Sequence, residues 1–305
     1  MAAIVVTGLR KSYGATEAVR GIDLTVREGE IFALLGPNGA GKTTTVEILE
    51  GFRERSGGQV SVLGHDPAAR DRDMRARIGI VLQSAGVESY LTVAEVLDLY
   101  RGYYPHPRDR DELLTLVGLA DRPNMRVGKL SGGQRRRLDV AVGLAGDPDL
   151  LFMDEPTTGF DPGARRQAWD VIRGLKDQGK TILLTTHFMD EASVLADRLA
   201  VMNAGTIVAE GTLDVIVAMG SHDTTIRFGL PNRTAPPDGL PGLNVAERGG
   251  FELTTPEPTS ALHRLTGWAL AANVELIELT VTRPSLEDTY LELTGHAASP
   301  VEPPT

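Results

Sequence analysis

A glycine-rich loop limits the possible folds of this chain more than any other feature. The segment Gly36-Pro37-Asn38-Gly39-Ala40-Gly41-Lys42-Thr43 matches the phosphate-cradling pattern G-x-x-x-x-G-K-[ST]. It follows the continuously apolar run Ile31–Leu35, which is typical of a strand covered on both faces. The segment after it, Thr44–Glu50, has a helical pattern. This strand–loop–helix order is the context that the motif requires, so the sequence predicts a P-loop α/β domain.

The residue types in this loop suit a nucleoside triphosphate and its magnesium ion. Gly36, Gly39 and Gly41 lack the Cβ atoms that would keep backbone N–H groups away from phosphate oxygens. Lys42 supplies a positive charge for those oxygens, and the Thr43 hydroxyl suits Mg²⁺. We expect nucleotide contacts along the whole loop, at Gly36, Pro37, Asn38, Gly39, Ala40, Gly41, Lys42, Thr43 and Thr44.

Strand and helix patterns alternate through residues 1–219. Strands are predicted at Ile4–Leu9, Asp23–Val26, Ile31–Leu35, Ile78–Leu82, Leu150–Met153 and Thr181–Thr185. A helix over Gly163–Asp177 separates the last two strands, and residues 84–145 read as a compact all-helical insert. The pattern predicts one α/β domain over residues 1–219, with a mainly parallel sheet and a β-rich N-terminal part.

The composition changes near Gly220, where proline- and glycine-rich links begin to separate short strand patterns. Strands are predicted at Thr224–Phe228, Leu243–Ala246, Phe251–Thr254 and Val274–Thr282, and helices at Ser260–Ala272 and Ser285–Leu293. Residues 220–296 are therefore predicted to form a small α+β domain. Residues 297–305 are predicted to be a disordered tail.

Composition narrows the class of protein. The 31 basic and 41 acidic residues give a net charge of −10, which argues against a nucleic-acid partner. The chain has no cysteine, which excludes disulfides and thiolate metal sites. No apolar run approaches the roughly 18 residues of a membrane span, and the opening residues lack the pattern of a secretory signal. Any role in a membrane therefore requires a separate membrane-spanning protein.

A second motif, Leu130-Ser131-Gly132-Gly133-Gln134, lies downstream of the glycine loop. The two motifs in this order resemble the ATP-binding cassette of ABC transporters, whose signature is LSGGQ. The resemblance implies ATP and Mg²⁺ as ligands and ATP hydrolysis as the activity. It also implies that Ser131, Gly132, Gly133 and Gln134 of one chain close over ATP held by another chain. Each element occurs once here, so a second copy or a homologous cassette is expected as partner.

The resemblance also assigns roles to residues at strand ends. Asp154 matches the aspartate that organises Mg²⁺, and Glu155 matches the catalytic base that polarises the attacking water. Gln83 resembles the Q-loop glutamine, which contacts Mg²⁺ and the attacking water. His187 resembles the switch histidine, which contacts the γ-phosphate. Judged alone, a glutamine or histidine at a strand end is more often a turn or solvent-facing residue.

Two further residues match the family less directly. Asp161, in Gly159-Phe160-Asp161-Pro162, resembles the D-loop aspartate that communicates across the dimer, although leucine is usual where Phe160 stands. Tyr13 matches the aromatic residue that stacks on adenine. Core packing is the alternative interpretation for this tyrosine.

The C-terminal segment Arg283–Gly295 resembles the ending of daunorubicin/drug-resistance ATPase subunits. These subunits pair with a separately encoded ABC-2 permease, so the resemblance implies a peripheral protein at the cytoplasmic face of the cell membrane. It implies the motor of an exporter for drugs or other lipophilic compounds. An importer ATPase remains the alternative, and a soluble non-transport ABC ATPase is a further one.

The start of the helical insert is the expected contact with such a permease. We predict that residues 85–104 form a groove for a cytoplasmic helix, with Tyr90, Leu91, Tyr100, Tyr103 and Tyr104 as contact candidates. A packed insert without a partner is the alternative. The three arginines Arg135–Arg137 are predicted to be a solvated helix face.

Overall fold

A computed structural model describes residues 1–81, 88–220, 223–231, 236, 242–245 and 250–295. The contacts divide the chain into two units, Met1–Leu213 and Asp214–Thr305. This division falls slightly before the expected boundary at 219/220. The expected tail, residues 297–305, and the first residues of the helical insert, 84–87, lie outside the described residues.

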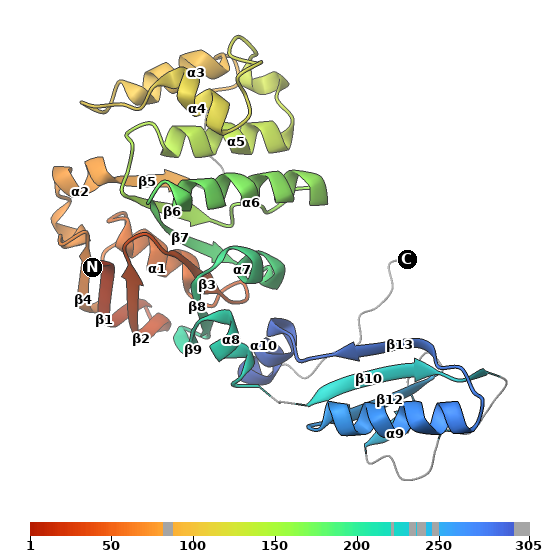
Figure 1. Ribbon diagram of the computed structural model, residues 1–305. Coiled ribbons are helices and arrows are strands. Elements are labelled where there is room, and N and C mark those ends of the chain that lie inside the picture. Colours follow the sequence, from red (N-terminus) through yellow and green to blue (C-terminus); the bar gives the residue numbers. More distant parts are fainter. Residues whose placement is uncertain (82–87, 221–222, 232–235, 237–241, 246–249, 296–305) are drawn as a thin grey trace. The chain divides into compact units, whose positions relative to one another are not determined.

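The described part of the first unit contains two sheets (Figure 1). The antiparallel sheet has the order β2-β1-β4, formed by β1 (Ala2–Tyr13), β2 (Thr16–Arg27) and β4 (Gly57–Val62). The larger sheet has the order β5-β6-β7-β3-β8-β9. Its strands are β3 (Ile31–Leu35), β5 (Ile78–Val81), β6 (Leu150–Asp154), β7 (Thr181–Thr186), β8 (Arg198–Asn203) and β9 (Thr206–Gly211). All neighbours pair in parallel except β8 and β9, which confirms the predicted mainly parallel sheet.

The helices of this unit follow from local capping and buried apolar residues. Thr92 and Glu95 form a reciprocal capping box at the start of α3, and Ser131 and Gln134 do the same for α5. The helices are α1 (Lys42–Leu49), α2 (Arg72–Arg77), α3 (Val93–Arg101), α4 (Arg110–Leu116), α5 (Gly132–Gly143), α6 (Pro162–Asp177) and α7 (Met189–Leu195). Helices α3, α4 and α5 contact one another and form the described part of the insert. Short 3₁₀ turns lie at η1 (Pro67–Ala69) and η2 (Val127–Lys129).

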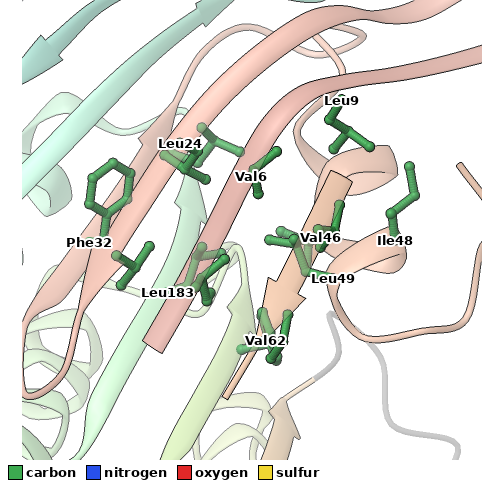
Figure 2. Packing of buried hydrophobic residues seen from close by; sticks show 14 of the residues in the cluster. Val6, Leu9, Leu24, Phe32, Val46, Ile48, Leu49, Val62 and Leu183 are labelled. Carbon is green, nitrogen blue, oxygen red and sulfur yellow. The ribbon is translucent and has the colours of Figure 1, made fainter. Parts of the chain in front are cut away.

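The core of this unit joins the two sheets around α1 (Figure 2). Val46 and Leu49 of α1 pack in one cluster with Val6 of β1 and with Phe32 and Leu183 of the larger sheet. All five residues of β3 are buried, as its continuous apolar run predicted. Because α1 is held from both sides, the loop before it is fixed at the edge where β3 ends.

The second unit holds a four-stranded antiparallel sheet in its described residues, with the order β11-β12-β10-β13. Helix α8 (Leu213–Val217) begins at the last residue of the first unit. The other elements are β10 (Thr224–Gly229), β11 (Leu243–Val245), β12 (Phe251–Thr255), α9 (Pro258–Ala271), β13 (Ile277–Thr282) and α10 (Leu286–Thr294). Ile226, Leu253 and Leu265 form a separate small core between the sheet and α9. None of the helices in the described residues is long and apolar enough to span a membrane.

Candidate active site

The predicted phosphate loop connects β3 to α1. The side chain of Lys42 is buried, and its Nζ donates hydrogen bonds to the backbone oxygens of Gly36, at 2.7 Å, and Pro37, at 3.1 Å. Burial lowers the pKa of Lys42, while the nearby charges of Glu155 and Asp154 raise it. Lys42 thus folds back onto its own loop, and Thr43, the next residue, is exposed.

Gly41 shows why this loop needs glycine. Its φ of +104° lies in the left-handed region, and a Cβ there would lie 2.5 Å from the backbone oxygen of Ala18. Gly39 also has a positive φ, of +81°, but a Cβ there would meet no atom within 4 Å. The hairpin of β1 and β2 therefore packs directly against the end of the phosphate loop.

Asp154 ends β6, which neighbours β7 in the parallel sheet. Thr185 of β7 donates a side-chain hydrogen bond to the Asp154 carboxylate. Because the order of strands is β6-β7-β3, this carboxylate and the phosphate loop lie at the same edge of the sheet. The position suits a carboxylate that faces a bound triphosphate and its metal ion.

Glu155 and His187 are brought together by the ends of β6 and β7. Nδ1 of His187 lies 3.0 Å from Oε1 of Glu155, and the Thr158 hydroxyl donates to Oε2 at 3.0 Å. Burial raises the pKa of Glu155, but the hydrogen bonds from His187 and Thr158 outweigh this, so its pKa lies below the ordinary value. Glu155 also has a φ of +46°, a conformation that non-glycine residues rarely adopt. The carboxylate is therefore held ionised in a specific orientation.

The signature residues line a cavity together with the D-loop. Ser131 caps α5, with its Oγ accepting from the backbone N–H of Gln134 at 3.2 Å. Asp161 caps α6 by accepting from the backbone N–H groups of Gly163 and Ala164, both at 2.9 Å. Signature and D-loop residues together line a cavity of about 520 Å³, whose lining includes Ser131, Gly132, Gly133, Gln134 and Asp161 but no residue of the phosphate loop.

Two further residues were predicted to contact the nucleotide or its metal ion. Gln83 lies outside the described residues. Tyr13 ends β1 and is 41% exposed, with Nζ of Lys11 5.0 Å and Cζ of Arg53 5.2 Å from its ring centre. The tyrosine is therefore not part of the buried core, which removes the alternative interpretation of core packing.

Three residues in this region were not recognised in the sequence. Thr185 orients Asp154, and Thr158 contacts Glu155. Arg136 was predicted to be solvated, but it is only 7% exposed, so that prediction is wrong. It donates hydrogen bonds to backbone oxygens of the segment that carries Asp154 and Glu155. Of these three residues, only Thr185 could have been noticed in the sequence, because it is a polar residue within a buried strand.

The residues at the sheet edge fit a magnesium ion that is shared with a nucleotide. In the part of the chain that the structure describes, no group of three or more His, Cys, Asp and Glu residues is placed to hold a metal alone. The oxygen groups suited to this ion are the hydroxyl of the exposed Thr43 and the Asp154 carboxylate. Such a pair suits Mg²⁺, which keeps water and phosphate oxygens as most of its ligands.

Comparison with protein families gives two matches. Residues 19–158 match the family described as ABC transporter, and residues 224–285 match the family described as ABC transporter domain-containing protein-like, C-terminal domain. The chain is 39% identical to the daunorubicin/doxorubicin resistance ATP-binding protein DrrA of Streptomyces peucetius, over 97% of this chain and 93% of that protein. It is 40% identical to the Nod factor export ATP-binding protein I of Rhizobium sp. (strain N33), over 96% of this chain and 97% of that protein.

Solved structures agree with this assignment. The ATP-binding subunit of an ABC transporter has a TM-score of 0.65 and 28% identity, with coverage of 71% of this chain and 92% of the other. A dimeric cassette in a post-hydrolysis state with ADP and Pi has a TM-score of 0.62 and 25% identity, with coverage of 69% and 98%. The predicted cassette fold is confirmed. The chain belongs to the ABC transporter ATP-binding proteins, and its activity is the hydrolysis of ATP.

Proposed function

We propose that this chain is the ATP-driven motor of an exporter, in which two cassettes enclose ATP and drive an ABC-2-type permease. The observation that carries the proposal is the separation of the two halves of the nucleotide site. The phosphate loop, Asp154, Glu155 and His187 gather at the sheet edge, whereas Ser131 lines another cavity. A second chain supplies the missing signature.

Glu155 acts as the general base in this proposal. Water attacks the γ-phosphorus, the new P–O bond forms, and the bond to the β-phosphate oxygen breaks. The Glu155 carboxylate accepts a hydrogen bond from the attacking water, orients it and takes up its proton, while ADP leaves with the bridging oxygen. His187, 3.0 Å from that carboxylate, keeps the base in place and faces the γ-phosphate. Gln83 is proposed to contact the same water.

The phosphate loop and the metal ligands hold the triphosphate. Lys42 releases the oxygens of Gly36 and Pro37 and turns to the phosphates, where backbone N–H groups of the loop also bind. Thr43, Asp154 and Gln83 are the proposed Mg²⁺ ligands, and the ion offsets charge on the phosphate oxygens when bound. Tyr13 is proposed to stack on adenine, and Asp161 to face the partner cassette.

Substitution of Glu155 by glutamine tests the catalytic assignment. The amide keeps the shape of the side chain but cannot accept a proton, so turnover should fall by about 100-fold or more while ATP binding persists. A dimer trapped with ATP should accumulate because hydrolysis reopens it. Retention of parental ATPase activity by Glu155→Gln would remove Glu155 from the role of base.

The proposed cargo is a drug or another lipophilic compound. Support comes from the names of the relatives, which refer to daunorubicin resistance and to Nod factor export. The proposed location is the cytoplasmic face of the cell membrane, since the permease must supply the spanning helices. Strains that carry the chain with its permease should accumulate less daunorubicin than strains with Glu155→Gln. Equal accumulation would reject a drug of this type as cargo.

A cavity at the helical insert is the proposed contact with the permease. It has a volume of about 480 Å³ and lies between α3, the end of α1 and β5. Tyr100 and Tyr104 line it together with Phe52, which is 66% exposed. Exposed aromatic residues beside a cavity favour a partner helix. Tyr90 and Tyr103 are also exposed, whereas Leu91 is half-buried.

Cysteine crosslinking tests this contact cleanly because the chain has no native cysteine. Cysteines at Glu88 and Tyr103, both exposed, should crosslink to a membrane protein in native membranes. A cysteine at the exposed Glu17 on β2, outside the lining of the cavity, is the matched control and should give no crosslink. No membrane-protein crosslink from Glu88 or Tyr103 would contradict the permease proposal.

A further inference from the structure

Arg136 is a buried cation on the helix that begins at the signature. Arg136 follows Ser131 by little more than one turn of α5. Its side chain is buried, with 7% exposed, whereas that of its neighbour Arg135 faces solvent. Burial of a guanidinium is costly, and it persists only where hydrogen bonds and opposite charges compensate. The contacts of Arg136 therefore indicate what the side chain does.

Three of its hydrogen bonds go to consecutive backbone carbonyls. Nε donates to the oxygen of Pro156 at 3.0 Å, and Nη2 donates to the oxygens of Asp154, at 2.9 Å, and Glu155, at 3.4 Å. The planar guanidinium presents several donors in a fixed geometry, which allows one side chain to hold adjacent carbonyls. These carbonyls belong to the segment in which Glu155 has its positive φ.

Buried acids surround this contact. Asp139 lies one turn further along α5, and Glu191 lies on α7; both are buried. Burial lowers the pKa of Arg136, and the charges of Asp139, Asp154 and Glu191 act in the opposite direction. Glu191 also accepts from the Thr157 hydroxyl at 2.7 Å, so the same segment is held at its other end.

We propose that Arg136 is a positioning residue for ATP hydrolysis. It fixes the backbone of Asp154, Glu155 and Pro156 so that the Glu155 carboxylate points at the attacking water. Because Ser131 caps the start of α5, one helix connects the signature to the base of the same chain. This inference rests on the proposed role of Glu155 as base.

The test compares Arg136→Met and Arg136→Lys with the parent full-length chain. Methionine removes every donor while keeping an unbranched side chain, so kcat should fall at least about tenfold, because small displacements of catalytic groups are costly. The affinity for MgATP, measured by fluorescent-nucleotide titration, should stay within about twofold, because Arg136 does not line the phosphate loop. Lysine keeps the charge and part of the donor capacity, and its kcat should lie between the two.

Arg135→Met is the matched control, since Arg135 is the exposed neighbour on the same helix. It should keep parental kcat and affinity. A parental kcat in Arg136→Met, or in Arg136→Lys if the methionine variant does not fold, would overturn the proposal. Equal loss of kcat in the lysine and methionine variants, accompanied by lost nucleotide affinity, would also overturn it, because it indicates a structural role alone. Glu155→Gln separates the role of Glu155 as base from the role of Arg136 as positioning residue. Parental turnover in Glu155→Gln would reject Glu155 as the base. Lost turnover in Glu155→Gln together with parental turnover in Arg136→Met would reject only the role of Arg136.

Discussion

At the scale of single residues, the site combines charges that the fold holds ready before nucleotide binds. Lys42 is buried against two carbonyl oxygens of its own loop, and Glu155 is kept ionised beside His187. A phosphate group can take the place of these carbonyl oxygens as the partner of Lys42. The lysine then exchanges two hydrogen bonds with neutral acceptors for stronger ones with a charged acceptor, which favours binding.

Lys42→Ala should weaken nucleotide binding. The charge partner of the phosphates is lost in both the bound state and the transition state, so the Kd for MgATP should rise by about tenfold or more. Fluorescent-nucleotide titration measures this directly. Unchanged affinity together with unchanged turnover would contradict the assignment of the phosphate loop.

Glu50 makes the stability of the fold dependent on pH. It is 6% exposed; burial raises its pKa to about 8, and the charges of Asp154 and Glu47 contribute to this rise. The folded state therefore keeps a proton that the unfolded chain releases above its ordinary pKa of 4.5. It follows that the contribution of Glu50 to the free energy of unfolding decreases as the pH rises from about 4.5 through about 8.

Glu50→Gln should remove this dependence, because the amide resembles the protonated carboxyl and does not titrate. The Tm of this variant should exceed that of the parent by a margin that grows between pH 5.5 and 8.5. The corresponding gain in the free energy of unfolding should reach a few kcal/mol, on the order expected for such a pKa shift. Thermal unfolding without nucleotide measures the difference, and Glu54→Gln, at an exposed position, is the control. A difference in Tm that does not change with pH would contradict the account.

The sequence alone identified those functional residues that belong to a short local motif. The phosphate loop, Asp154, Glu155 and His187 follow apolar strands, and the structure puts those strands side by side. Arg136 was misread because its partners are backbone oxygens some twenty residues along the chain, and nothing in three consecutive arginines distinguishes the buried one. Thr185 was missed for a similar reason, since its function depends on the pairing of β6 with β7.

At the scale of elements, the short, continuously apolar strands were predicted most closely. The predicted Ile31–Leu35 and Leu150–Met153 match β3 and β6 closely, because continuous apolar runs have few alternatives. Strands β4, β8 and β9 were not predicted. β4 and β9 lie at sheet edges and carry residues that are only partly buried, so their patterns are weak. β8 was missed although it is an interior strand with four buried residues. The last strand begins at Ile277 rather than at the predicted Val274.

The contact between the β1–β2 hairpin and the phosphate loop can be tested at Gly41. Gly41→Ala combines a strained φ with a Cβ that would clash with the oxygen of Ala18, so we expect a loss of about 2–4 kcal/mol in stability. Gly39→Ala is the matched control, with a similar φ but open space, and should lose about 1–2 kcal/mol. Urea unfolding compares them. Equal losses of stability in the two variants would show that the contact with the hairpin adds nothing to the cost of Gly41→Ala.

At the scale of the whole molecule, the chain joins a cassette to a second unit with its own sheet and core. The cassette contains one phosphate loop and one signature, in separate places, and a related cassette has been solved as a dimer with ADP and Pi. The central claim is therefore that each hydrolytic site is built by two chains. In this proposal, each site uses the loop and base of one chain and the signature of the other.

Two purified heterodimers test this claim most directly. In the first, one chain carries Ser131→Arg and the other carries Glu155→Gln; in the second, one chain carries both substitutions and the other is the parent. If sites are shared, the first heterodimer keeps one intact site and hydrolyses ATP, while the second has none and is inactive. Activity in the second heterodimer and none in the first would show that each chain completes its own site, and would contradict the account.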